Sequence, residues 1–222
     1  MSEGRAATVL AILKKTIAYP QKVKAKQDPF QTLVTTIISQ NTADKNTERA
    51  FENLSMKFEI TPQILAKAEV GEIEDTIKVA GLYKNKAQAI KRAATIILQN
   101  YRGTLQPILK LPLEEARTVL MQFPGVGPKT ADVVLLFSAN QPTIPVDTHV
   151  NRLAKRLGFA SAKSDYESVR RGLQLLFDPR DYFAVHLLLI EHGRRTCKAL
   201  HPNCLQCAVN VYCPSNGLWE TL

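Results

Sequence analysis

The chain has 222 residues, of which 45% are hydrophobic, and its 29 Lys and Arg against 20 Asp and Glu give a net charge of +9. This length and composition are typical of a folded protein with one large domain or two small ones, and the absence of any apolar run of about 18 residues excludes a transmembrane helix. The basic charge favours an acidic polymer as partner, with a merely solvated basic surface as the alternative.

Helical periodicity runs through almost the whole chain, and no strand alternation appears. Asp28 and Pro29 form a helix start signal before the apolar run at 31–38. Gly and Pro residues separate the periodic segments, so the connections are short, and the bend at 140–147 is the candidate domain boundary. We predict an all-α chain with helices at residues 6–19, 31–38, 43–55, 62–68, 71–80, 86–99, 113–122, 128–139, 148–158, 164–176 and 182–193.

A hairpin rich in Gly and Pro joins two of these helices at Phe123-Pro-Gly-Val-Gly-Pro-Lys-Thr-Ala131. Its glycines permit positive φ and close approach of another backbone, and Pro128 suits the first turn of a helix, where no amide proton is needed. The amide groups left free in such a turn belong to Gly125, Gly127, Lys129 and Thr130. With the positive end of the helix dipole they predict an anion site suited to a DNA phosphate, and an ordinary helix connector is the alternative.

Lys129 and Asp147 are the candidate catalytic residues. A lysine in the first turn of a helix, if also partly desolvated, should have a lowered pKa, because the dipole and burial both disfavour the ammonium form. Because a neutral amine is a nucleophile, the sequence predicts a nucleophilic lysine. The alternative is a charged lysine that only binds a DNA phosphate. Asp147 stands at the entry to a helix, where its ordinary role is the N-cap. Both roles are compatible only if one carboxylate oxygen faces a pocket.

Four cysteines lie in one stretch near the C-terminus, with six, two and five residues between them, and they are the only cysteines of the chain: Cys197, Cys204, Cys207 and Cys213. Four thiolates this close in sequence favour zinc, copper(I) or an iron–sulfur cluster. Disulfides are the alternative, but they are typical of small secreted chains, and no secretory signal pattern is present. Only one short Cys-x-x-Cys pair occurs, so the spacing favours a cubane cluster without excluding zinc.

The hairpin, the Val146-Asp-Thr-His149 segment and the cysteine pattern together resemble endonuclease III, within the helix-hairpin-helix DNA glycosylases. Ile38-Ser-Gln40, Gly81-Leu-Tyr83 and His192-Gly-Arg194 also match, and the resemblance covers about residues 8 to 213. It implies a six-helix barrel module at 25–137, with the helix-hairpin-helix at about 113–137. It also implies a cluster module formed by 1–24 and 142–222, with the cluster loop at 197–213 and the substrate cleft between the two modules.

The same resemblance implies base excision repair by a bifunctional DNA N-glycosylase and AP lyase. Lys129 would attack C1′ of an oxidised pyrimidine nucleotide flipped out of duplex DNA, form a Schiff base and nick the strand 3′ by β-elimination, while Asp147 would stabilise the developing positive charge. Gln40 and Leu82 would fill the gap left by the flipped nucleotide, and ordinary surface packing is the alternative for both. The further DNA contacts would be Gly125, Val126, Gly127, Thr130 and His149. The four cysteines would hold a [4Fe-4S] cluster, with zinc as the less favoured metal.

The expected partner is double-stranded DNA with damaged or abasic sites, bound by a monomer with no membrane association. We expect an intracellular protein, cytoplasmic and nucleoid-associated in a prokaryote. Two other functions compete with the glycosylase/lyase. One is a thymine or uracil mismatch glycosylase of the same fold, and the other is a non-enzymatic helix-hairpin-helix module with a structural zinc.

Overall fold

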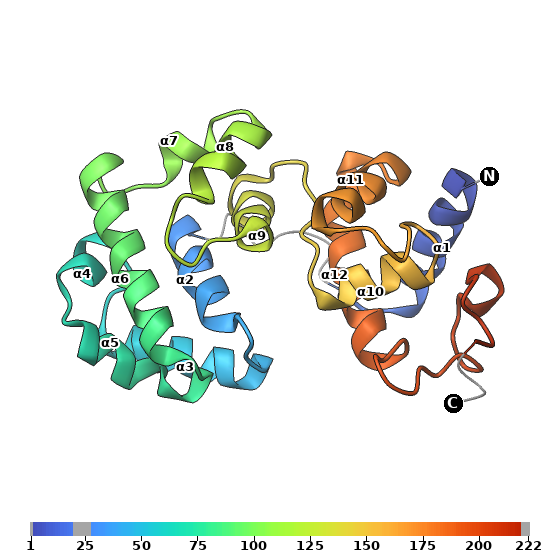
Figure 1. The fold of residues 1–222 in the computed structure, drawn as a ribbon, viewed down its shortest axis with the longest axis horizontal. Helices are drawn as coiled ribbons and strands as arrows, with labels where there is room; N and C mark the ends of the chain where they lie inside the picture. Colours follow the sequence, from blue (N-terminus) through green and yellow to red (C-terminus); the bar gives the residue numbers. More distant parts are fainter. Residues whose placement is uncertain (1, 20–27, 219–222) are drawn as a thin grey trace. The chain divides into compact units, whose positions relative to one another are not determined.

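The computed structural model describes residues 2–19 and 28–218, and every regular element in these ranges is helical (Figure 1). The prediction of an all-α chain is therefore confirmed. The chain divides into two compact units, one of residues 24–141 and the other of 1–23 together with 142–222. The predicted module boundary between residues 24 and 25 lies outside the described residues. None of the helices in the described part has the length and apolarity that crossing a bilayer requires.

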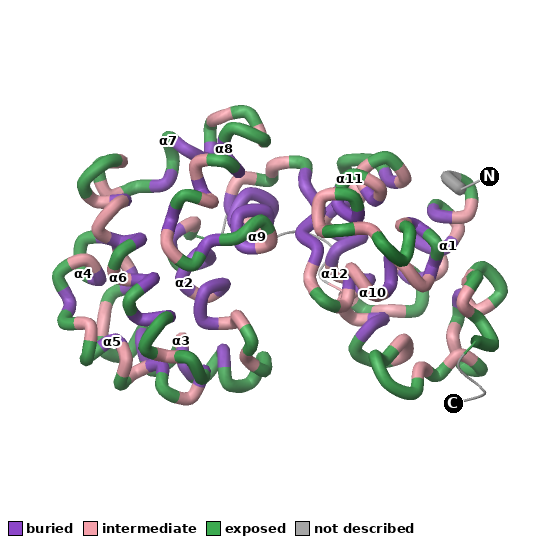
Figure 2. The backbone as a smooth tube through the Cα atoms, in the orientation of Figure 1, coloured by how far each residue is buried: buried purple, intermediate pink, exposed green. Residues whose placement is uncertain are grey.

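The unit of residues 24–141 is a helical domain around one apolar core. Its elements are α2 (Pro29–Ser39), α3 (Asp44–Lys57), α4 (Pro62–Lys67), α5 (Val70–Ile77), the 3₁₀ turn η1 (Lys78–Ala80), α6 (Tyr83–Asn100), α7 (Gln106–Leu109), α8 (Leu113–Leu120) and α9 (Pro128–Ala139). Helix α4 packs on α6, and α2 packs on α9. Leu33, Ile90 and Leu135 are completely buried among them, and Figure 2 colours much of α2 and α9 as buried.

The second unit is discontinuous in sequence, because its core combines the N-terminal helix with helices from the C-terminal third. Its elements are α1 (Ser2–Thr16), α10 (Thr148–Arg156), α11 (Tyr166–Leu176), η2 (Pro179–Asp181), α12 (Tyr182–Arg195) and η3 (Asn210–Tyr212). Helix α1 contacts α11 and α12, and α10 packs on α12. Val9, Leu153 and Leu188 lie in this core.

The helix starts follow the local sequence closely. Asp28 is the N-cap of α2, with its side chain accepting a hydrogen bond from the Gln31 amide at 2.8 Å, and Pro29 occupies the first turn. This start signal is confirmed. The predicted helix at 71–80 instead ends at Ile77 and continues as the 3₁₀ turn η1, and α6 begins three residues before the predicted position 86. Both differences arise at the tight turn around Gly81, which has a φ of +64°.

Candidate active site and metal centre

The hairpin between α8 and α9 places Lys129 in the first turn of α9, as predicted. Lys129 is half-buried, whereas Gly127, the N-cap, is exposed. The backbone N–H groups in the first turn of a helix have no acceptor within that helix. In α9 this applies to Lys129 and Thr130, whereas Pro128 has no N–H group. The hairpin therefore presents amide donors and the positive end of the α9 dipole next to the Lys129 side chain.

Gly125 is required at the tip of this hairpin for two reasons. Its φ of +76° lies in the left-handed region, which disfavours side chains, and a Cβ on Gly125 would stand 2.9 Å from the Cβ of Ala89. Gly127 differs, because its φ is −97° and a Cβ there would meet nothing within 4 Å. The hairpin thus packs closely on α6 at the first glycine and leaves room at the second one.

The predicted gap-filling residues lie on the same surface as the hairpin. The side chain of Gln40 donates hydrogen bonds to the Gly125 carbonyl at 2.8 Å and to the Thr130 hydroxyl at 3.3 Å. Leu82 is 62% exposed in a left-handed conformation with a φ of 47°. Gln40, Leu82 and Gly125 line one pocket of about 370 Å³. The structure therefore brings Gln40, Leu82 and Gly125 together, whereas the predicted contacts Val126 and Thr130 are both buried.

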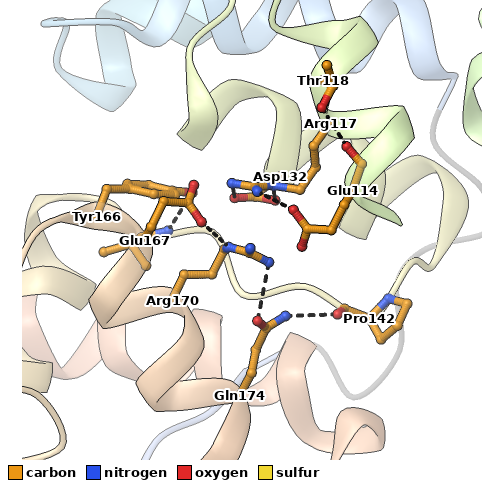
Figure 3. A network of polar contacts seen from close by, with 10 residues as sticks. Glu114, Arg117, Thr118, Asp132, Pro142, Tyr166, Glu167, Arg170 and Gln174 are labelled. Atoms are coloured by element: carbon orange, nitrogen blue, oxygen red, sulfur yellow. Dashed lines mark hydrogen bonds and ion pairs between the residues drawn. The ribbon is translucent and has the colours of Figure 1, made fainter. Parts of the chain in front are cut away.

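A buried ion pair fixes the two hairpin helices to each other (Figure 3). Arg117 on α8 is 4% exposed and donates to both carboxylate oxygens of Asp132 on α9, at 2.8 and 3.3 Å. Its remaining amino group donates to Glu114 at 2.8 Å. Asp132 is completely buried and lies three residues after Lys129, on the same helix. The pairing is bidentate, so it sets the orientation of α9 and not only its distance from α8.

In the other unit, Asp147 is the N-cap of α10, and one of its carboxylate oxygens accepts a hydrogen bond from the Val150 amide at 2.7 Å. Within the described residues, the second oxygen has no hydrogen-bond partner. Asp147 also lines an open pocket of about 270 Å³ with Tyr166 and Asn151. Asp147 thus caps α10 and also lines a pocket, and its catalytic role stays a prediction. The preceding segment is held by the His186 ring, which lies 2.9 Å from the Pro145 carbonyl.

His149 lies on α10, one turn before Arg152, and is hydrogen-bonded to it. The Nδ1 atom of His149 is 3.1 Å from the Arg152 guanidinium, and because arginine only donates, Nδ1 accepts this hydrogen bond. Arg152 also donates to the carbonyls of Gly193 and Cys197, at 2.9 and 3.0 Å. A Cβ on Gly193 would stand 2.9 Å from the His149 ring, so α10 and α12 approach each other closely here. His149 is thus held from one side by α10 and from the other by α12.

The four cysteines line one cavity in this unit, together with His192 and Arg156: Cys197, Cys204, Cys207 and Cys213. Burial raises the pKa of the Cys207 and Cys213 thiols, so binding of a metal there must displace protons. In the described part of the chain, no three His, Cys, Asp or Glu side chains stand where they could hold a single ion. All four cysteines are free, so the alternative of disulfides is not seen.

Comparison with known proteins shows the family. The model of the HhH-GPD superfamily of base excision DNA repair proteins matches residues 34–179. The chain belongs to this superfamily. The endonuclease III of Sulfolobus acidocaldarius is 38% identical over 185 residues, which cover 83% of this chain and 81% of the relative. That of Thermotoga maritima is 37% identical over 198 residues, which cover 88% and 86%.

Solved structures extend the match to the fold of this HhH-GPD protein. A trapped endonuclease III–DNA covalent intermediate has a TM-score of 0.84 and 29% identity, and the match covers 97% of both chains. A thermostable thymine-DNA glycosylase has a TM-score of 0.78 over 97% and 96% of the two chains, but at 20% identity it shows the shared fold alone. The helix-hairpin-helix glycosylase fold is therefore confirmed, and the chain is a DNA glycosylase and AP lyase of base excision repair.

The contacts that Arg152, Arg156 and His192 make with the cysteine loop and its neighbours were not predicted. Arg156 donates to the Cys197 thiol at 3.4 Å and to the Lys198 carbonyl at 2.7 Å. His192 lies 3.6 Å from the Cys207 thiol, and burial lowers the pKa of His192 to about 4. Arg152 and Arg156 are four residues apart on α10, so both reach the same side of this helix. Two arginines four residues apart on a predicted helix are a signal in the sequence, and it could have suggested that this helix face binds the carbonyls and thiols of the cysteine loop.

Proposed function

We propose that this enzyme removes oxidised pyrimidines from duplex DNA, with Lys129 as nucleophile and Asp147 as electrostatic partner. The observation that carries the proposal is the position of Lys129. Its side chain starts from the first turn of α9, where the backbone amides of the turn and the positive end of the helix dipole suit a DNA phosphate. A phosphate bound at these amides would bring the sugar of a neighbouring nucleotide within reach of the amine.

The reaction requires the damaged nucleotide to leave the base stack, since C1′ is not accessible inside a duplex. Gln40 and Leu82 would occupy the gap. Their positions support this role, because Leu82 is exposed and both residues line the same pocket. The Lys129 amine would then attack C1′, so that the C1′–N bond breaks and the base departs with a proton. Covalent catalysis of this kind divides one difficult step into two easier ones.

The sugar would open to a Schiff base between C1′ and Lys129. Loss of a C2′ proton would break the C3′–O bond by β-elimination, and hydrolysis of the imine would free the lysine. The uncapped oxygen of Asp147 would stabilise the positive charge that develops on the sugar, because a carboxylate placed in advance needs little reorganisation. Asp147 would thus stabilise α10 with one oxygen and the transition state with the other.

We also propose that the four cysteines hold a [4Fe-4S] cluster. The donor set fits, because four thiols line one common cavity, and a cluster of several iron atoms is wider than a single ion. When bound, the cluster would cross-link the loop 197–213, and its exposed basic residues, including Lys198 and His201, could then meet the phosphate backbone. Such a protein is expected to be brown and to contain iron. Stoichiometric zinc without iron would contradict this assignment.

The proposed partner is duplex DNA with a damaged or abasic site, bound by one copy of the chain. The basic net charge of +9 agrees with such a partner, and binding should weaken as the salt concentration rises. Because the enzyme acts on genomic DNA, we propose that it works inside the cell, in the compartment that holds that DNA.

The proposal is tested with duplexes that contain thymine glycol, dihydrouracil, G·T or G·U, with base loss and strand nicking measured separately. Borohydride should trap a covalent complex on the two oxidised pyrimidines, and Lys129→Ala should abolish the trapping. Lys91→Ala is the control, because Lys91 lies on α6 and donates to the Ala68 carbonyl. Activity confined to G·T and G·U duplexes would instead favour the mismatch glycosylase.

A further inference from the structure

Lys86 on α6 is a charged side chain in the interior of its unit, with an exposed fraction of 4%. Lysine is almost never buried without partners. Here the ammonium group donates to the Ile38 carbonyl at 2.9 Å, the Ala80 carbonyl at 2.9 Å and the Thr42 hydroxyl at 2.6 Å. These three bonds use all the donors of the group. Desolvation lowers the pKa of Lys86, so the retained hydrogen bonds offset a real cost of burial.

The three acceptors belong to two segments that are far apart in sequence. Ile38 lies in the last turn of α2, two residues before Gln40, and Ala80 ends η1, two residues before Leu82. Thr42 links the same two segments, because its hydroxyl donates to the Ala80 carbonyl while the Gln40 carbonyl lies 3.1 Å away. One ammonium group and one hydroxyl therefore join the loop after α2 to the turn before α6.

Both segments hold backbone conformations that L-residues adopt rarely. Asn41 has a φ of 51° and Leu82 a φ of 47°, and a leucine in this region is an outlier. Conformations of this kind persist only where the surroundings hold them, and they occur often at functional sites. Leu82 has little packing of its own to hold it, because its side chain is 62% exposed. The hydrogen bonds to Ala80 supply a nearby anchor.

We infer that Lys86 and Thr42 are a positioning pair that keeps Gln40 and Leu82 at a fixed spacing for their entry into duplex DNA. Gln40, Leu82 and Lys86 line one pocket between the two segments, and Thr42 is hydrogen-bonded to Lys86. This inference rests on the proposed function, in which Gln40 and Leu82 fill the gap left by the flipped nucleotide. Lys86 itself touches neither the substrate nor the reacting atoms; it acts through the two segments.

Lys91 offers a matched control for this role. It lies on the same helix, is half-buried, and donates to a single carbonyl, that of Ala68, at 2.6 Å. Lys91 makes no hydrogen bond to the segments of Gln40 or Leu82 in the described structure. Lys86→Met and Lys91→Met therefore remove the same charge from the same helix, and only the first removes the link between the two segments.

The test measures base release from a dihydrouracil duplex under single-turnover conditions, with 2-aminopurine beside the lesion to report flipping. Strand nicking of a single-stranded abasic oligonucleotide is measured in parallel, because it needs no gap to be filled. Lys86→Met should slow base release and the fluorescence change about tenfold or more, since small misplacements are costly. Nicking of the single strand should stay within about twofold of the wild type, and Lys91→Met should match the wild type in both assays.

Thr42→Val and Thr42→Ser decide the question even if Lys86→Met does not fold. Valine has the shape of threonine without the hydroxyl, so Thr42→Val should lose duplex activity in the same direction, and Thr42→Ser should keep it. The inference is overturned if Lys86→Met equals Lys91→Met, if duplex and single-strand activities fall equally, or if Thr42→Val equals Thr42→Ser. A wild-type enzyme inactive on every substrate would instead refute the proposed function.

Discussion

Asp147 has one observed role, as the N-cap of α10, and one proposed role, in catalysis, and substitution can separate the two. One carboxylate oxygen caps α10 through the Val150 amide, and the other has no partner among the described residues. Asp147→Asn keeps an acceptor for the cap and removes the negative charge, whereas Asp147→Ala removes both. The two variants should therefore differ in stability and agree in their loss of activity.

The expected magnitudes follow from the cap geometry. Asparagine and aspartate are about equally good N-caps, so Asp147→Asn should change the free energy of unfolding by less than about 0.5 kcal/mol. Asp147→Ala should cost about 1 kcal/mol, which lowers the Tm by about 2–4 °C in a chain of this size. Loss of the charge that faces the developing cation should raise the barrier by about 3 kcal/mol in both variants, a factor of about 100 in rate.

The assay combines thermal unfolding with single-turnover base release from a thymine glycol duplex. Thr61→Ala is the control, because Thr61 caps α4 in the other unit through the Ile64 amide. It should lose a similar amount of stability and keep the rate of base release. Full activity in Asp147→Asn would refute the reasoning, since it would leave Asp147 with the capping role alone.

Three further predictions concern the scaffold of the site. Gly125→Ala should lower the free energy of unfolding by about 1–3 kcal/mol, because of its positive φ and the close neighbouring side chain, while Gly127→Ala should change it by less than about 1 kcal/mol; urea unfolding checks both. Arg117→Met should destabilise by about 3–5 kcal/mol by leaving the Asp132 carboxylate buried without its main partner, and addition of Asp132→Asn should recover about half of the loss in the same assay. Burial lowers the pKa of His192 from about 6.5 to about 4, so in the protein without a bound metal the free energy of unfolding should fall by up to about 3 kcal/mol as the pH drops through this window. Urea titrations of His192→Asn at several pH values should show a shallower dependence, and an unchanged slope would contradict the assignment.

Most helices could be predicted because their start signals are local. Asp147 and Pro128 stand directly before or at the start of α10 and α9, and a capping side chain or a proline acts within its own turn. The start of α6 could not be predicted in the same way. Its N-cap, Leu82, adopts a left-handed conformation that leucine disfavours, so the tertiary structure overrides the local preference.

The candidate site shows the same division. The cysteine pattern was visible because its four members lie within one short segment of sequence, and they do line one cavity. The burial of Lys86 was not visible, because its partners Ile38 and Ala80 lie 48 and 6 residues away and nothing in the local pattern marks a buried lysine. Arg152 is similar, since its acceptors on α12 and beyond become neighbours only in the folded unit.

The discontinuous unit has a consequence for the order of events during synthesis on the ribosome. Residues 24–141 form one continuous stretch and can fold as soon as they emerge, since domains generally fold as units. Helix α1 leaves the ribosome first, yet its packing partners α11 and α12 follow more than a hundred residues later. The apolar stripe of α1, with Val9 and Leu13, therefore stays exposed until α11 and α12 have been synthesised. During this interval chaperones can bind the exposed stripe of the nascent chain, and the four cysteines become available only at the end of synthesis.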